Sequence, residues 1–257
     1  MQTAEGYYYT DTLGEMSKDP VVLIHGIGGS HSSWPAAMRK LQGRRTIVLD
    51  LPGHGHSECS ACQTVAAYAR SVESVLRAAH IYRAVLVGYS LGGQIALQFG
   101  INHPNQVAGL GLIACSSEPA IPTKLFELLN DPSAAQAVRS MVSSLMFVLE
   151  TSSLKIEEME KVLFSARKGT ISADWRAFHE YRFPDLEHDL REVPLWLCNA
   201  TDDRLISGRT LRELKRRRPS SICTFIDRCG HGILAEQPLL LARALEMAFL
   251  QVENSPA

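Results

Sequence analysis

Short apolar segments alternate with helical patterns along most of this 257-residue chain. The segments are rich in Val, Ile and Leu and lack the alternation of a half-exposed strand, so they are expected to be strands covered on both faces. They are residues 21–25, 46–51, 84–90, 107–115, 194–200 and 221–227. Helical spacing predicts helices over 63–79, 91–102, 207–217 and 236–252. The sequence therefore predicts right-handed βαβ units, an α/β fold around a mainly parallel sheet, with residues 7–12 as an edge strand.

One long stretch interrupts this rhythm. Residues 117–190 contain few strand-like segments but helical patterns over 122–130, 134–150, 154–168 and 172–182. We expect a helical insertion into a core formed by residues 1–116 and 191–257. Some apolar side chains of the insertion should face a substrate, and Leu145 and Phe147 are the candidates.

Composition excludes several classes of protein. The 26 Lys and Arg residues nearly balance 27 Asp and Glu residues, so no overall field favours nucleic acid or an anionic membrane. No apolar run approaches the roughly 18 residues that span a bilayer. The N-terminal sequence MQTAEGYYYT lacks the basic and apolar regions of a secretory signal. The six cysteines are therefore expected to be reduced thiols, and the protein to be cytoplasmic.

The sharpest motif is Gly88-Tyr89-Ser90-Leu91-Gly92, between a predicted strand and a predicted helix. A serine on a tight strand-to-helix turn projects its Oγ from the carboxyl edge of the sheet, and small neighbours let the backbones pass. Helix amides at that point favour a developing oxyanion. Ser90 is therefore the candidate nucleophile, and the adjacent Tyr89 a candidate substrate contact.

A glycine loop, His25-Gly26-Ile27-Gly28-Gly29, follows the strand at 21–25. Acyl transfer needs two N–H donors aimed at the tetrahedral oxygen. One should come from Leu91, the residue after the nucleophile, and the other from this loop, at Ile27. The turn Asp50-Leu51-Pro52-Gly53-His54-Gly55-His56-Ser57 is assigned a structural role.

The segments HGIGGS, DLPGHGHS and GYSLGG, in this order and spacing, resemble the α/β-hydrolase fold superfamily, of the serine esterase type. The resemblance covers about 21–116 and 193–250, and it implies that the insertion is a cap. It also implies the order nucleophile, acid, histidine for a catalytic triad.

The resemblance places the acid after the strand at 194–200 and the base after the last strand. Asp203 occupies the acid position, although Ala200 stands where the family has glycine, and the adjacent Asp202 remains an alternative. His231, within Cys229-Gly230-His231-Gly232, occupies the histidine position. A serine–histidine–aspartate set implies an acyl-enzyme mechanism that needs no metal or organic cofactor.

Three rival functions are open. The chain is similar to pimeloyl-acyl-carrier-protein methyl ester esterases, which makes an acyl carrier protein a possible partner. It is also similar to SHCHC synthase, a lyase, but Gln94 stands where that family has an arginine. A non-catalytic hydrolase-fold binding protein is the third. A small-molecule ester is the expected substrate, with no nucleic acid partner and no membrane span.

Three further features are interpreted as structural. His54 and His56, and Cys59-x-x-Cys62, lack the additional ligands of a metal site. The basic cluster of residues 209–218 is expected to be a solvated helix face rather than a docking surface for an acidic partner.

Overall fold

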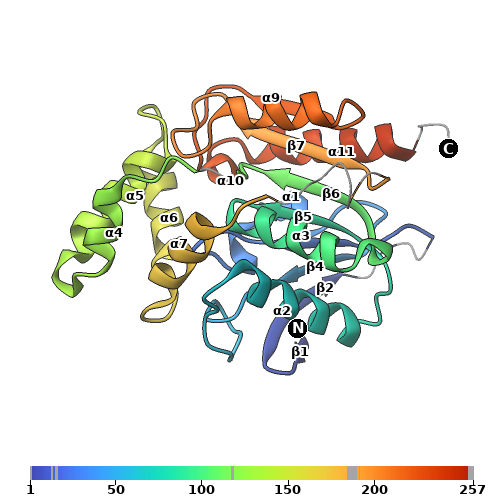
Figure 1. The fold of residues 1–257 in the computed structure, drawn as a ribbon, viewed down its shortest axis with the longest axis horizontal. Coiled ribbons are helices and arrows are strands. Elements are labelled where there is room, and N and C mark those ends of the chain that lie inside the picture. The colour runs from blue at the N-terminus through green and yellow to red at the C-terminus, as the bar shows by residue number, and fades with distance from the viewer. Residues whose placement is uncertain are drawn as a thin grey trace.

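An eight-stranded sheet forms the centre of the computed structural model, which describes residues 2–12, 14, 17–116, 119–183, 190 and 192–253 (Figure 1). The strand order is β1-β2-β4-β3-β5-β6-β7-β8. The strands are β1 Gln2–Ala4, β2 Tyr7–Thr12, β3 Val21–Ile24, β4 Thr46–Leu49, β5 Ala84–Tyr89, β6 Val107–Ile113, β7 Leu195–Ala200 and β8 Ile222–Ile226. Strands β1 and β2 pair antiparallel, as do β2 and β4, and all other neighbours are parallel. The predicted α/β class and mainly parallel sheet are confirmed.

The central strands are buried on both faces, which explains their continuous apolar sequences. Every residue of β3, β4 and β6 is buried. Each of the six predicted core strands is present, and residues 7–12 form β2 as expected. The outermost strand β1 was not predicted, because its three residues carry no apolar pattern.

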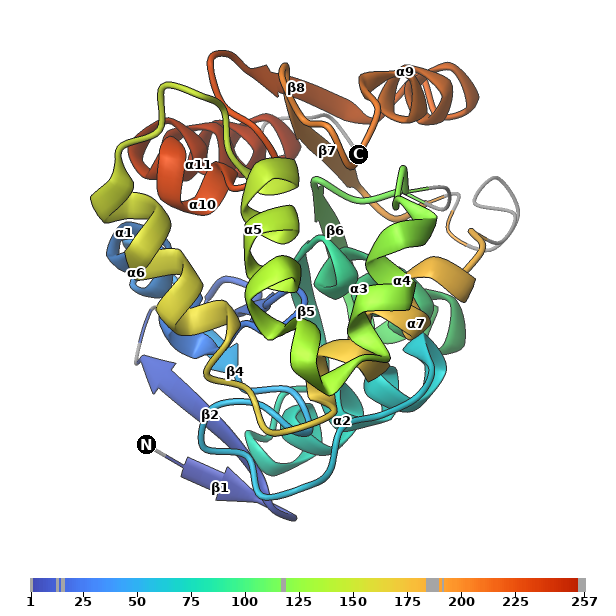
Figure 2. The same cartoon turned by 90° about the vertical axis from the view of Figure 1, so that its left-hand side faces the viewer.

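Helices cover both faces of the sheet. They are α1 Ala36–Arg39, α2 Val65–Ala78, α3 Leu91–Asn102, α9 Gly208–Arg217, α10 Ile233–Glu236 and α11 Pro238–Glu253, with short 3₁₀ turns at His31–Ser33 and Pro104–Gln106. Figure 2 shows α1 and α11 on one side of the sheet and α3 and α9 on the other. The helix predicted over 236–252 begins at Pro238, whose fixed φ suits the first turn and which follows a separate short helix.

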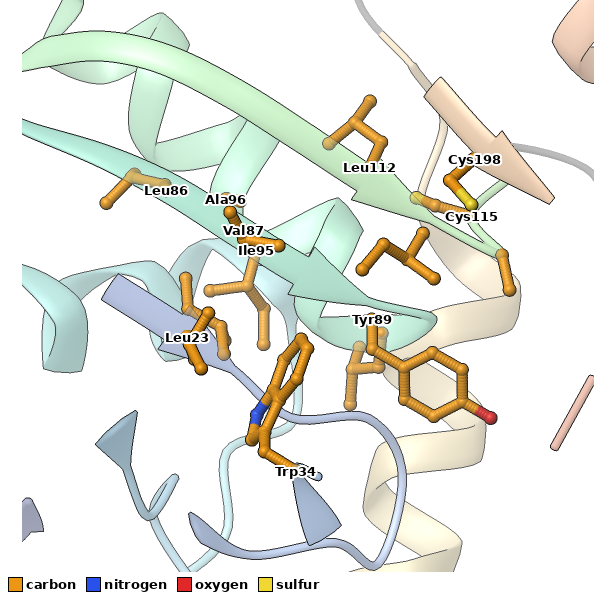
Figure 3. Packing of buried hydrophobic residues seen from close by; sticks show 14 of the residues in the cluster. Leu23, Trp34, Leu86, Val87, Tyr89, Ile95, Ala96, Leu112, Cys115 and Cys198 are labelled. Atoms are coloured by element: carbon orange, nitrogen blue, oxygen red, sulfur yellow. The ribbon is translucent and has the colours of Figure 1, made fainter. Parts of the chain in front are cut away.

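The core lies between the central strands and these helices. Figure 3 shows Leu86, Val87 and Leu112 of β5 and β6 beside Ile95 and Ala96 of α3. Trp34, from the loop after β3, is 1% exposed and fills the region between Leu23 and Tyr89. This packing fixes the position of the turn that follows β5.

Among the described residues between β6 and β7 there are four helices, with a 3₁₀ turn at Pro132–Ala134. They are α4 Thr123–Leu129, α5 Ala135–Met146, α6 Ser153–Leu163 and α7 Thr170–Glu180. They form a separate layer at one edge of the sheet (Figures 1 and 2). We call these four helices the cap. The boundaries expected at residues 117 and 191 lie outside the described residues.

Candidate active site

Ser90 lies on a sharp turn between β5 and α3. Its φ is +55°, a conformation that non-glycine residues rarely adopt and that marks a strained strand-to-helix turn. A Cβ at Gly88 would lie 2.1 Å from the carbonyl oxygen of Gly92, and one at Gly92 would lie 2.0 Å from that of Ile24. Only glycine fits at both positions, which accounts physically for the spacing of the motif.

Three side chains from three loops meet at this turn. Ser90 Oγ lies 3.0 Å from His231 Nε2, and His231 Nδ1 lies 2.9 Å from Asp203 Oδ2. Because an ionised carboxylate only accepts, Nδ1–H donates to Asp203 and leaves Nε2 to accept the hydroxyl proton of Ser90. Ser90 and His231 are buried, and so is the side chain of Asp203, which strengthens these interactions. The arrangement can activate a serine hydroxyl for attack on a carbonyl carbon.

The two adjacent aspartates have different contacts. Asp203 Oδ1 accepts hydrogen bonds from the backbone N–H groups of Leu205 and Ile206, both at 2.8 Å. One oxygen of the carboxylate therefore stabilises the local turn, and the other contacts His231. Asp202 is exposed and contacts Thr201 Oγ1 at 3.0 Å. Ser207, not Asp202, caps α9. The geometry thus brings the predicted acid, Asp203, to His231.

The loop after β3 lies directly against the serine. A Cβ at Gly26 would lie 3.2 Å from Ser90 Cβ. The next residue, Ile27, lines the same pocket as Ser90. Leu91 is the first residue of α3, so its N–H has no intrahelical acceptor. Both predicted oxyanion residues therefore stand beside Ser90.

An apolar pocket lies above Ser90, between the core and the cap. The described lining residues are Ile27, Tyr89, Ser90, Val142, Met146, Leu163, Phe164, Ile171, Trp175, Leu205 and His231. Its accessible volume is about 30 Å³, room for about two water molecules at most. Tyr89 lines the pocket and also donates from its Oη to the carbonyl of His231 at 2.7 Å.

The other two predicted substrate contacts, Leu145 and Phe147, have neighbours outside this pocket lining. Phe147 packs beside Gly232, where a Cβ would lie 2.4 Å from Phe147 Cε1, and Leu145 packs against the hydrophobic core. Neither is among the described residues that line the pocket, whereas Val142 and Met146 are. The reason is the face that α5 presents: Val142 and Met146, one turn apart, point to Ser90, and the helix ends at Met146.

The cap is hydrogen-bonded to the loop that carries His231. The N–H of Gly232 donates to the carbonyl of Met146 at 2.7 Å. The buried Glu236 accepts from the N–H of Gly230 at 2.7 Å and from that of Val148 at 3.0 Å. The position of the histidine and the position of the cap are therefore linked.

The other motifs have structural partners. Gln94 is fully buried and donates to the carbonyls of Ser116 and Phe178, so it joins α3 to the cap.

All six cysteines are free thiols. The described residues contain no group of three or more His, Cys, Asp or Glu arranged to hold a metal ion. Within the same residues, no helix has the length and apolar character required to cross a membrane.

Comparison with known proteins places the chain in a family. A model described as the alpha/beta hydrolase family matches residues 21–244. An uncharacterized protein of Mycobacterium bovis is 31% identical over 213 residues, which cover 81% of this chain and 56% of that relative, so the match spans only about half the relative's length. A 2-hydroxy-6-oxononadienedioate/2-hydroxy-6-oxononatrienedioate hydrolase of Paraburkholderia phymatum is 29% identical and matches 87% of this chain and 84% of that one. The enol-lactonase of Burkholderia xenovorans LB400 has the same fold, with a TM-score of 0.84, 19% identity, and coverage of 96% of this chain and 98% of its own.

Proposed function

The chain belongs to the alpha/beta hydrolase family, and from this premise we propose that it is a serine hydrolase that cleaves carboxylic esters through an acyl-enzyme. The observation that carries the proposal is the hydrogen-bonded chain from Ser90 Oγ through both nitrogens of His231 to Asp203. It stands at the edge of the sheet where β5, β7 and β8 end. In open α/β sheets, ligands bind at this edge.

The proposed reaction has two halves. His231 accepts the proton of Ser90 as its Oγ attacks the ester carbonyl, and the N–H groups of Ile27 and Leu91 receive the oxyanion. Asp203 stabilises the imidazolium, which then protonates the leaving alcohol. Water, deprotonated by the same histidine, attacks the acyl-enzyme, and the carboxylic acid leaves as Ser90 regains its proton.

The pocket favours an uncharged, apolar acyl group. Its described lining includes neither Arg nor Lys, so it offers no cation to a second carboxylate. This argues against a dicarboxylate substrate, which the name of the Paraburkholderia phymatum relative specifies. The same lack, together with Gln94 in its structural role, argues against an SHCHC synthase-like reaction. Because the pocket is so small, an acyl chain must displace cap side chains to enter.

The basic face of α9 gives little support to a carrier-protein partner. Arg216 and Arg217 pair with Glu213 on the same helix, and Lys215 donates to the carbonyl of Pro219. Free small-molecule esters are therefore the proposed substrates. The free thiols favour a reducing compartment, and we propose the cytoplasm.

Replacement of the nucleophile tests the proposal. Ser90→Ala should retain its melting temperature but lose kcat toward p-nitrophenyl esters by about 10⁴-fold or more. A fluorophosphonate should label the wild type at Ser90 and leave the variant unlabelled. Ser172→Ala, a half-buried cap serine that bonds the carbonyl of Leu129, is the matched control and should remain active. A folded wild type without turnover or labelling would favour a non-catalytic binding protein.

A further inference from the structure

A buried carboxylate on the cap contacts the loop that should hold the oxyanion. Asp174, on α7, is fully buried, and its Oδ2 accepts the backbone N–H of Gly28 at 3.0 Å. Gly28 directly follows Ile27 in the loop after β3. A hydrogen bond to the Gly28 N–H fixes the peptide plane between these two residues and so limits the orientation of the Ile27 backbone.

Two further side chains contact Asp174, and one of them, His54, has a second partner. His54 Nε2 lies 2.8 Å from Asp174 Oδ2, and Tyr68 Oη donates to Oδ1 at 2.5 Å. His54 Nδ1 faces the carbonyl of Pro52 at 2.9 Å. Because a carbonyl only accepts, Nδ1 carries a proton, and with Asp174 ionised Nε2 carries one as well. Asp174 and His54 therefore form a buried ion pair, with Tyr68 and Gly28 as additional donors.

A buried ion pair is costly to desolvate and is weak evidence for stability on its own. Here all four partners come from different elements: the cap helix α7, helix α2, the turn after β4 and the loop after β3. The pair therefore fixes the cap relative to the loop beside Ser90. The adjacent Trp175 and the preceding Ile171 line the substrate pocket, so one turn of α7 contacts both the substrate space and the loop.

We propose that Asp174 is a positioning residue that sets the oxyanion donor at Ile27 by holding the N–H of Gly28, and that it transmits the position of the cap to that donor. The proposal rests on the function proposed above. It assigns Asp174 no contact with the reacting atoms. Asp174 acts through the loop, so its removal should weaken binding of the tetrahedral oxyanion more than binding of the ester.

The cap has further attachments to the core, so the variant protein should fold. Arg167 donates to the carbonyls of Glu58 and Cys59, and Thr170 Oγ1 donates to that of Gly53. These contacts do not involve Asp174. Substitution of this one carboxylate should leave α7 in place while releasing the loop.

The experiment compares Asp174→Asn with Glu160→Gln, a carboxylate-to-amide change that affects only the bond to Ser143 within the cap. Active sites are counted by end-point fluorophosphonate labelling, and kcat and KM are measured with p-nitrophenyl butyrate. Loss of one oxyanion donor costs about 10²–10³ in kcat, so misalignment should lower kcat of Asp174→Asn by about 10–100-fold, with KM within about threefold. Affinity for a trifluoromethyl ketone, which forms a tetrahedral adduct, should fall by a similar factor. Glu160→Gln should match the wild type.

A second variant covers the case in which Asp174→Asn does not fold. Tyr68→Phe removes one hydrogen bond to Asp174 Oδ1 and keeps the ring. It should lower kcat by about three- to tenfold, less than Asp174→Asn, again without a change in KM. Unchanged kcat per labelled site in the variants, even with lower melting temperatures, would overturn the positioning role. A wild type that neither labels nor turns over any ester would instead overturn the proposed function, and this proposal with it.

Discussion

Two neighbouring carboxylates near His231 have different exposure and different partners. The side chain of Asp203 is buried and accepts a hydrogen bond from His231 Nδ1, whereas Asp202 is exposed and contacts Thr201. We expect Asp203→Asn to lower kcat by about 10⁴-fold, because an amide that donates to Nδ1 imposes the wrong imidazole tautomer. The asparagine oxygen can still accept from Leu205 and Ile206, so the variant should fold.

Asp202→Asn is the natural control for this substitution. It removes a charge one residue away and should keep kcat within about twofold, since interactions of a solvent-exposed charge are worth little. The measurements are kcat with p-nitrophenyl butyrate and the melting temperature of both variants. An inactive Asp202→Asn beside an active Asp203→Asn would transfer the role of the acid to Asp202.

The positions of Ser90, Asp203 and His231 could be predicted because short local sequences determine them. The Gly88 and Gly92 positions follow from backbone clearance, and the fold order places each loop at the same sheet edge. The pocket wall could not be predicted in this way. Which face of α5 meets Ser90 depends on how the cap packs, and the apolar pattern suggested Leu145 and Phe147 rather than Val142 and Met146.

At the scale of one element, two valines of helix α5 can be compared, one that lines the pocket and one that does not. Val138 and Val142 are one turn apart and both buried, but only Val142 is among the described residues that line the pocket. Val142→Ala should enlarge the space above Ser90. The ratio of kcat/KM for p-nitrophenyl hexanoate to that for the acetate should rise about tenfold, the effect of about one methylene in an apolar pocket.

Val138→Ala removes the same two methyl groups from the same helix and should leave that ratio unchanged. Each variant should lose about 1–3 kcal/mol of unfolding free energy, because both remove buried apolar atoms. Equal ester profiles for the two variants, measured beside their denaturation midpoints, would contradict a role for Val142 in chain-length selection.

For the whole molecule, the alternation of apolar segments and helical patterns was sufficient to predict the sheet and its flanking helices. The antiparallel strand β1 and the four-residue helix α1 were not predicted, since elements this short contain too few residues to display a period. The ion pair between Asp174 and His54 was also not predicted. His54 was interpreted as structural without a partner, because its partner lies 120 residues away and only tertiary packing brings the two together.

That ion pair should make the stability of the whole chain depend on pH. Burial alone would lower the pKa of His54, but Asp174 and the carbonyl of Pro52 outweigh it and raise the pKa above its ordinary value. A histidine whose pKa is higher in the folded state than in the unfolded state stabilises the fold. That stabilisation is fully present below the unfolded pKa, about 6.5, and is lost as pH rises through the folded pKa.

Other buried groups titrate outside this range. The fully buried His25 has its pKa lowered to about 4 by burial and by His54, so its effect on the free energy of unfolding lies below pH 6.5. Burial raises the pKa of Cys62 to about 11 and of Cys229 to about 12, and these thiols would destabilise the fold only above about pH 8.

The window from about pH 6.5 to 8 therefore excludes the titration of His25 and of these thiols, and a double variant separates His54 from the other histidines, such as His31 beside Asp50. The melting temperature of the wild type should fall as pH rises across this window. The double variant His54→Gln with Asp174→Asn has no titrating group in the pair, and its melting temperature should change less over the same range, even if it is lower throughout. The double variant is needed because His54→Gln alone would leave Asp174 as a buried unpaired carboxylate with its own pH dependence. The readout is the slope of melting temperature against pH, measured in buffers of equal ionic strength. Parallel slopes for the two proteins would mean that His54 is not charged in the native state, and that Asp174 holds Gly28 without an ion pair.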